Sequence, residues 1–202
     1  MHNFRTLTPL FTELSSERIL LRPINIDDAQ LLYDAVEEDP QHVGIWIPAA
    51  LHSHASIDAT RNLLINWQAE WLLRTNMISS IKDRTSGRFL GTIGLHTRDW
   101  DNGFFEIGYW LRKSGTGQGF MTEATRLLTD FTFTQLKANR VQIRCDARNT
   151  ASGNVARRLG YVFEGTHRND SVDGDGNLRS TLFFSLISSE WQVIKTPTHI
   201  DH

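Results

Sequence analysis

The sequence is poor in several features that would assign a protein to a class at once. It has one cysteine, Cys145, in 202 residues, so the chain cannot form an internal disulfide. Its 23 acidic and 21 basic residues nearly cancel, and no apolar run reaches the length of a membrane helix. Residues 1–11 lack the apolar core of a signal peptide. We therefore expect a cytoplasmic protein that recognises its ligands at a local site, with neither nucleic acid nor membrane as a partner.

The length fits one domain. We expect residues 1–14 to form an N-terminal extension, 15–194 the folded domain and 195–202 a C-terminal tail. Cys145 alternates with Val141 and Ile143, which is typical of the inward face of a strand, so core filling is favoured over a nucleophilic role.

Hydrophobic periodicity changes several times along the chain. The order of elements predicts a mixed α/β fold with a mostly antiparallel, twisted sheet flanked by helices. The segment after the first helix, through residues 45–48, is expected to be a loop. Strand patterns cover 18–23, 77–82, 89–95, 104–111, 141–147, 161–165 and 180–187, and helical patterns cover 27–38, 56–74, 122–136 and 152–159.

The most informative stretch combines a strand, a loop with glycines at 115, 117 and 119, and the start of a helix. Glycine lets the backbone approach a ligand closely, and the free amides at a helix N-terminus attract an anion such as a diphosphate. A dinucleotide fingerprint would need glycine where Phe120 stands, and a nucleotidase loop would need Gly-Lys-Ser/Thr. A tight connection without a ligand is the alternative that the glycines alone leave open.

Two motifs in sequence order resemble a known family. Glu106-Ile-Gly-Tyr-Trp-Leu111 is followed by Gly117-Gln-Gly119, and a second segment runs from Asn149 to Gly165. They resemble the GNAT N-acetyltransferase superfamily, and in particular its RimJ/RimL-like branch of ribosomal-protein N-terminal acetyltransferases. The resemblance spans residues 15–192.

One position departs from the family pattern. Ser114 stands where the phosphate-binding motif has glutamine or arginine. Backbone amides are therefore the expected main ligands of the diphosphate.

The resemblance implies acetyl-coenzyme A as co-substrate, held where strand 104–111 splays from strand 141–147 in a V shape. It implies direct transfer of the acetyl group to a primary amine, above all the N-terminal α-amine of a ribosomal protein. Neutralising an α-amine at pH 7 costs about 1 to 1.4 kcal/mol, against about 4.6 for lysine. The alternatives are a small amine, amino acid or antibiotic as acceptor, or a non-catalytic coenzyme A binding module. The apolar tryptophans could also be buried in a homodimer.

The resemblance also implies roles for individual side chains. Glu106 shares a strand face with Gly108 and Trp110 and is the expected base, acting through water; a salt-bridged carboxylate is its alternative. Ser152 is the expected proton donor to the leaving sulfur, or merely a helix cap, and Asn149 a pantetheine contact, or merely an Asx-turn. The expected cofactor-binding residues are Tyr109, Trp110, Leu111, Gly115, Thr116, Gly117, Gln118, Gly119, Phe120, Met121, Thr122, Asn149 and Asn154.

No metal site is expected. The run 173–177 looks like a calcium loop, but Leu178 and Phe184 occupy the positions where an EF-hand needs glycine and glutamate, so a hairpin turn is favoured. His52 and His54 have no third ligand at a recognisable spacing.

The wall for the acceptor is expected from the segments with least motif content. These are residues 45–48, the helix with Trp67 and Trp71, and the hairpin 168–179.

Overall fold

The computed structural model describes residues 8–195. The first half of the expected N-terminal extension, 1–7, and all of the expected tail 195–202 except Lys195 lie outside the described residues. The helices are η1 (Ile26–Asp28), α2 (Ala29–Glu37), α3 (Pro40–Gly44), α4 (Pro48–Ser53), α5 (Ile57–Leu73), η2 (Lys113–Gly115), α6 (Phe120–Thr134), α7 (Thr150–Arg158) and α8 (Ser188–Lys195). The strands are β1 (Leu14–Ser15), β2 (Ile19–Pro23), β3 (Asn76–Asp83), β4 (Phe89–Asp99), β5 (Phe104–Leu111), β6 (Arg140–Asp146), β7 (Val162–Val172) and β8 (Leu178–Ile187).

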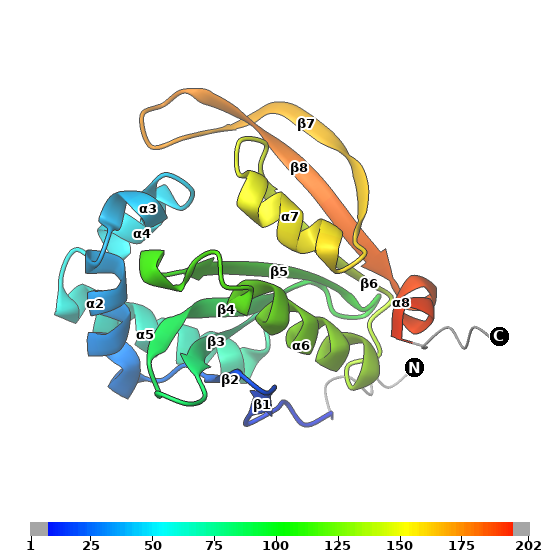
Figure 1. Cartoon of the computed structure of the whole chain (residues 1–202), viewed down its shortest axis with the longest axis horizontal. Helices are drawn as coiled ribbons and strands as arrows, with labels where there is room; N and C mark the ends of the chain where they lie inside the picture. Colours follow the sequence, from blue (N-terminus) through cyan, green and yellow to red (C-terminus); the bar gives the residue numbers. More distant parts are fainter. Residues whose placement is uncertain (1–7, 196–202) are drawn as a thin grey trace.

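The strands form one eight-stranded sheet in the order β1-β2-β3-β4-β5-β6-β8-β7 (Figure 1). Every neighbouring pair is antiparallel except β5 and β6, which are parallel. The predicted fold class, a mixed α/β fold with a mostly antiparallel sheet, is confirmed.

The one parallel pair is short. Strand β5 is in register with β6 only over Phe104–Glu106 and residues 140–142. Beyond that point β5 stays paired with β4 as far as Leu111, while β6 follows β8 as far as Asp146. The two strands therefore diverge in the predicted V-shaped splay, and the sheet opens beside the second half of β5.

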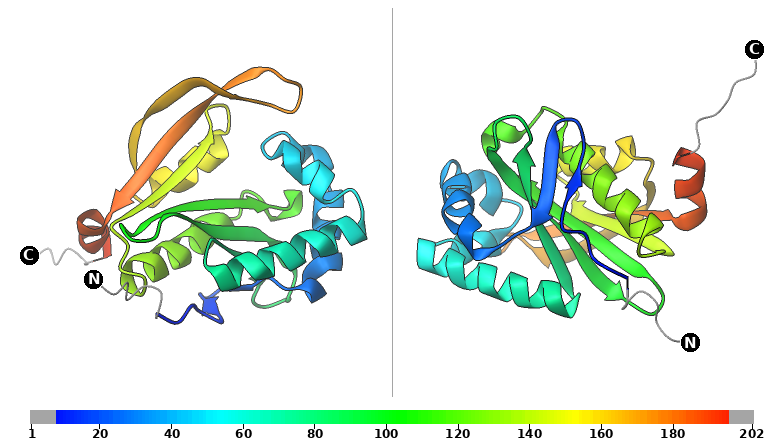
Figure 2. Two further views of the ribbon diagram at one scale, coloured as in Figure 1. Left: turned by 180° about the vertical axis from the view of Figure 1, so that it is seen from behind. Right: turned by 90° about the horizontal axis from the view of Figure 1, so that it is seen from below.

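Helices cover both faces of the sheet (Figures 1 and 2). On one face, α6 places Ala124, Leu128 and Phe131 in a core with Phe105 and Ile107 of β5. On the other, α2 and α5 pack over a smaller core that Trp110 borders. Alternate residues of β5 thus face two separate cores, which gives the strand an α6–α7 side and an α2–α5 side.

The segment after α2 corrects one expectation. It forms the two short helices α3 and α4 instead of a loop, and Pro40 and Pro48 occupy their first turns. Proline is tolerated there because the first-turn amide has no partner within the helix.

The C-terminal helix α8 was also missed. Trp191 of this helix is buried and stacks on Phe133 of α6, with ring centroids 5.9 Å apart. The hairpin of β7 and β8 is longer than expected and arches away from the sheet toward α3 and α4 (Figure 1). Within residues 8–195, no helix combines the length and the apolar character required to cross a membrane.

Candidate active site

The glycine loop after β5 has a backbone suited to an anion. Gly117 and Gly119 have φ values of +74° and +82°, in the left-handed region that favours glycine. Gly119 is the N-cap of α6 and makes no side-chain capping bond, and a Cβ on Gly117 would meet nothing within 4 Å. The first amides of this 15-residue helix therefore lack a capping side chain within the described part of the chain.

The entry to this loop is anchored by Glu38. Its carboxylate accepts hydrogen bonds from the Ser114 amide at 2.6 Å, the Ser114 hydroxyl at 3.0 Å and Arg112 Nε at 2.6 Å. Burial raises the pKa of Glu38, but the bonds from Ser114 and Arg112 outweigh it and hold the pKa at about 2. Ser114, which departs from the family pattern, thus helps to fix the loop.

Arg18 of the segment before β2 clamps the other side of the loop. It donates to the Gln118 carbonyl oxygen at 3.0 Å and forms an ion pair with Glu123 at 2.5 Å. Its guanidinium also lies 5.0 Å from the centroid of the Phe120 ring. Gly115, Phe120 and Met121 are buried, Thr122 is half-buried, and Thr116, Gly117, Gln118 and Gly119 are exposed.

Two hydroxyl groups meet across the splay. Ser152 of α7 donates from its hydroxyl to the Tyr109 hydroxyl, which donates to the Ser152 carbonyl oxygen, both at 3.2 Å. The N-cap of α7 is Asn149, whose side chain accepts from the Ser152 amide at 3.0 Å. Asn149, and not Ser152, therefore caps α7. The roles of Ser152 as a proton donor and of Asn149 as a pantetheine contact stay predictions.

Near this pair, Cys145 is a buried thiol whose pKa is raised by burial. Leu111 is half-buried, and its carbonyl oxygen lies 3.2 Å from His42 Nε2. Asn154 lies one turn into α7, is exposed, and accepts a bond from Arg157 at 3.4 Å.

Glu106 stands where β5 and β6 part. Its carboxylate accepts from Gln142 Nε2 at 2.6 Å, Arg98 Nε at 3.0 Å and Arg144 Nη2 at 3.0 Å, and its side chain is 10% exposed. Burial raises its pKa, but the bonds from Arg98, Arg144 and Gln142 prevail, and the pKa lies below its ordinary value. The salt-bridged environment that we named as an alternative is present, and the role as a base stays a prediction.

A cavity of about 310 Å³ opens on the α2–α5 side of β5. It brings Tyr109 and Trp110, two expected cofactor residues, together with Ile47 and Trp67 of the expected acceptor wall. Trp71 instead packs edge-on against Phe11. The full lining is Ile47, Ala49, Ala50, Ser53, His54, Leu63, Trp67, Ile78, Thr92, Gly94, His96, Gly108, Tyr109 and Trp110.

Sequence reasoning missed His96, which lies on the sheet side of this cavity. The signal was a pair of glycines: Gly94 and Gly108 are direct partners across the β4–β5 ladder and leave room for a ring beside them. Finding it required the exact register of the two strands.

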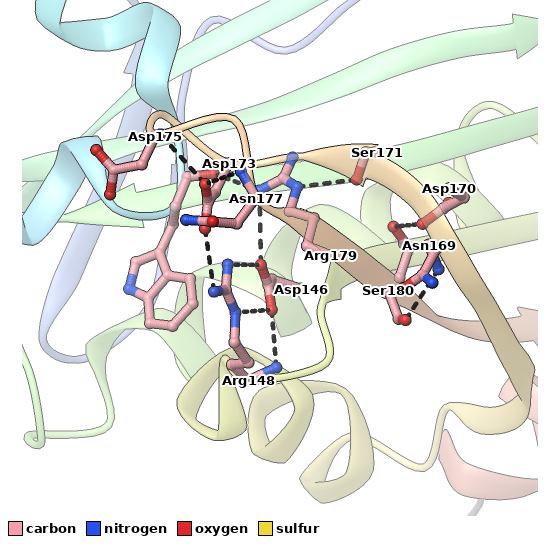
Figure 3. Close-up of polar contacts among 12 residues, drawn as sticks. Asp146, Arg148, Asn169, Asp170, Ser171, Asp173, Asp175, Asn177, Arg179 and Ser180 are labelled. Carbon is pink, nitrogen blue, oxygen red and sulfur yellow. Dashed lines mark hydrogen bonds and ion pairs between the residues drawn. The ribbon is translucent and has the colours of Figure 1, made fainter.

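Polar contacts tie the hairpin of β7 and β8 to the end of β6 (Figure 3). Asp146 accepts from Arg148 Nη2 at 2.8 Å and lies 3.8 Å from Arg179 Nη1, and Arg148 also bonds Asp173 at the hairpin tip at 3.2 Å. Arg179 reaches the carbonyl oxygen of Trp46, between α3 and α4, at 3.4 Å. Figure 3 shows the two arginines meeting the carboxylate of Asp146 below the tip.

The run 173–177 forms the turn of this hairpin. Asp173 Oδ1 accepts from the amides of Asp175 and Asn177 at 3.1 and 2.9 Å. The predicted hairpin turn is confirmed.

Comparison with known proteins agrees with this arrangement. Residues 18–162 match the model of the acetyltransferase (GNAT) domain, and the chain belongs to this family of N-acetyltransferases. It is 30% identical over 184 residues, 91% of this chain and 98% of the other, to YdaF of Bacillus subtilis (strain 168), which is named provisionally as a ribosomal N-acetyltransferase. It is 23% identical to the [ribosomal protein uS5]-alanine N-acetyltransferase of Escherichia coli (strain K12), over 95% of this chain and 98% of that one.

The fold also matches solved structures. RimL, a ribosomal L7/L12 α-N-protein acetyltransferase in complex with coenzyme A, superposes with a TM-score of 0.81 over 87% of this chain and 97% of that one, at 20% identity. At this identity the match supports the fold alone.

Proposed function

We propose that the chain binds acetyl-coenzyme A and transfers its acetyl group to the N-terminal α-amine of a protein, a ribosomal protein in the first instance. The observation that carries the proposal is the pair of left-handed glycines, Gly117 and Gly119, at the uncapped start of α6. Bare backbone amides at that place suit a diphosphate. The names of YdaF and of the uS5 enzyme support the acceptor class.

The residues around the splay fit the co-substrate. Residues 115–122 would hold the diphosphate, and Asn149 and Asn154 would contact the pantetheine arm. Tyr109, Trp110 and Leu111 would lead that arm to the cavity, which Tyr109 and Trp110 line.

The chemistry needs no covalent intermediate on the enzyme. The amine nitrogen attacks the thioester carbonyl carbon, the C–N bond forms, the C–S bond breaks, and amide and coenzyme A thiol result. Ser152, freed from capping and bonded to Tyr109, would give the leaving sulfur its proton and regain one from solvent. Glu106 is the proposed base for the amine proton and would act through an intervening group such as water. Burial keeps Cys145 protonated, which disfavours an acyl-cysteine.

The cavity supports an acceptor with a small, uncharged first residue. Its described lining includes two histidines and no aspartate, glutamate, lysine or arginine, and its polar content is low. At about 310 Å³ it lies near the lower end, about 300 Å³, of the usual range for ligand pockets. A second charged group on the acceptor would lose hydration there without gaining a partner.

Calorimetry with acetyl-coenzyme A and thiol release with a panel of amines test the proposal. Gly117→Val should abolish binding of acetyl-coenzyme A, because it strains the backbone and fills the cradle. Gly176→Val is the matched control, since Gly176 has φ +82° and equally open surroundings but lies in the β7–β8 turn. Absent binding, or unchanged binding by Gly117→Val, would contradict the proposal.

The amine panel separates the acceptor classes. Thiol release with peptides that begin in alanine or serine is the expected result. Release with small amines alone would favour a small-molecule acetyltransferase, and tight binding without any amine-dependent release would favour a non-catalytic binding module.

A further inference from the structure

His96 lies where it could accept a proton from a ligand in the cavity. No sequence motif identifies this residue. It lies on β4, directly across the ladder from Glu106, and lines the cavity beside the splay. Its side chain is half-buried, so the ring lies in the wall of the cavity with part of it open.

The hydrogen bonding of the ring determines which nitrogen is free. His96 Nδ1 lies 2.6 Å from Asn76 Oδ1, on the neighbouring strand β3. A carboxamide oxygen only accepts hydrogen bonds, so Nδ1 carries the proton in the neutral ring. The lone pair is then on Nε2.

Nε2 stands over the two paired glycines of the cavity floor. A Cβ on Gly108 would lie 3.0 Å from it, and a Cβ on Gly94 would lie 3.1 Å from it. Any side chain at Gly108 would therefore compete with the imidazole for space. The absence of side chains at both positions leaves Nε2 open toward the part of the cavity that Tyr109 and Trp110 also line.

Burial and the charges around the ring together favour its neutral form. Burial lowers the pKa of His96 most; Glu106 of β5 and Glu70 of α5 raise it, while Arg98 of β4 and Arg144 of β6 lower it. The net result is a pKa below the ordinary value of 6.5.

His54, the other histidine of the cavity, is less suited to the role. It is only 4% exposed, and burial lowers its pKa to about 4. Its Nδ1 lies 3.1 Å from the Thr60 hydroxyl, which donates its own hydrogen to the Ser56 carbonyl oxygen. His54 is thus more deeply buried than His96, and its Nδ1 is already engaged.

We infer that His96 Nε2 is the group that receives the proton of the acceptor amine, and that Glu106 acts through it by stabilising the imidazolium. The inference rests on the proposed function and supplies the group between Glu106 and the amine. At neutral pH an N–H bond of the incoming ammonium breaks and its proton passes to Nε2, which releases it to solvent. The neutral amine then forms the C–N bond, and the proton that its nitrogen must still lose passes to Nε2 in the same way. The imidazolium then returns the proton to solvent, while the thiolate takes its proton from Ser152.

His96→Gln tests this role, because glutamine keeps polarity and similar size but takes up no proton at neutral pH. At pH 7 its kcat should fall by about 10²- to 10⁴-fold, the usual contribution of a general base. The loss should narrow toward pH 9.5, because an α-amine with a pKa near 7.7 to 8.0 is then deprotonated without help. Affinity for acetyl-coenzyme A should stay within about twofold. His52→Gln, at an exposed histidine outside the cavity lining, is the control.

Each outcome has a defined meaning. A loss that is the same at every pH indicates a structural role and overturns the inference, as does unchanged kcat. If the wild type acts on small amines but not on peptides, the acceptor proposal fails while His96 is still tested on those amines. A wild type that binds acetyl-coenzyme A but acts on no amine overturns both.

Two further measurements do not depend on the stability of His96→Gln. Gly108→Ala should displace the imidazole and lower kcat at pH 7 with the same narrowing at high pH, since the new methyl group meets only His96. Nitrogen-15 NMR of the imidazoles should show Nδ1 protonated and Nε2 bare, with a titration below pH 6.5. The opposite tautomer would overturn the inference whatever the activity.

Discussion

The two halves of β5 differ in how charged groups near them are stabilised. In the first half, Phe104–Glu106, the strand is paired on both sides, and three side chains surround the Glu106 carboxylate. In the second half, from Ile107, β6 has left, and the strand leads to a helix start that no described side chain caps. The charge of Glu106 is thus neutralised by side chains of the chain itself. At the start of α6, by contrast, the backbone amides are left without side-chain partners, where the charge of a ligand is expected. Changes in the first half should therefore affect stability, and changes in the second half should affect binding or turnover.

The largest effect on stability should come from Glu106→Gln. Arg98 and Arg144 would lose their shared counter-charge at a side chain that is 10% exposed, which should lower the free energy of unfolding by about 2 kcal/mol. Thiol release should fall as well, because the imidazolium of His96 would lose its stabilising charge. Urea unfolding measures the first effect.

Glu164→Gln is the matched control for that variant. It removes the partner of Arg140 in a pair whose side chains are 29% and 39% exposed, and should cost less than about 1 kcal/mol. If Glu106→Gln proved no more destabilising than Glu164→Gln, the contrast between the two halves of β5 would be wrong.

A smaller, pH-dependent effect is expected for Glu38→Gln, at the entry to the loop. Glu38 has a folded pKa of about 2 against an ordinary 4.5, so the fold favours its ionised form. Its contribution is complete above about pH 4.5 and is lost as the pH falls toward 2. Glu38→Gln should lower stability by about 1 to 2 kcal/mol at pH 7, and the difference should shrink between pH 4.5 and 3.

Unfolding curves at pH 7, 4.5 and 3 provide the check. A difference from wild type that stays constant over this range would mean that Glu38 acts by shape alone. Weaker binding of acetyl-coenzyme A is also expected, because Ser114 and Arg112 would lose their common anchor.

Local sequence signals were sufficient for the loop and for most of the sheet. Glycines at fixed spacing between a strand and a helix identify the loop because its geometry depends on adjacent residues. The splay could be expected only through the family resemblance, since the divergence of β5 from β6 depends on residues far apart in sequence. The register that sets His96 over Gly94 and Gly108 likewise has no local signature.

The start of α7 shows what the sequence alone could not predict about Asn149 and Ser152. Both residue types are favoured N-caps, so the sequence could not say which one caps α7. The backbone at Asn149 has φ −84° and ψ 73°, outside the helical region, and its side chain reaches the Ser152 amide. Tertiary structure thereby leaves the Ser152 hydroxyl for Tyr109.

Asn149→Ala should lower stability, in addition to any effect on the pantetheine contact proposed above. Loss of the capping bond should lower the free energy of unfolding by about 1 kcal/mol. Thermal or urea unfolding measures this, and Asn154→Ala, on the exposed side of the same helix, is the control, for which a change within about 0.5 kcal/mol is expected. An equal loss in both variants would argue against the cap.

Ser152→Ala should show the smallest change in stability and the clearest separation of folding from turnover. Because Ser152 is not the cap, removal of its hydroxyl should alter the free energy of unfolding by no more than about 1 kcal/mol, the worth of one bond to Tyr109. If the hydroxyl delivers the proton to the leaving sulfur, kcat should fall by about 10²-fold or more while affinity for acetyl-coenzyme A is kept. The fall should be smaller for a thioester whose thiol has a lower pKa, since such a thiolate leaves without a proton. An equal fall for both thioesters would mean that Ser152 only positions Tyr109, and the second half of β5 would then act on the reaction through packing alone.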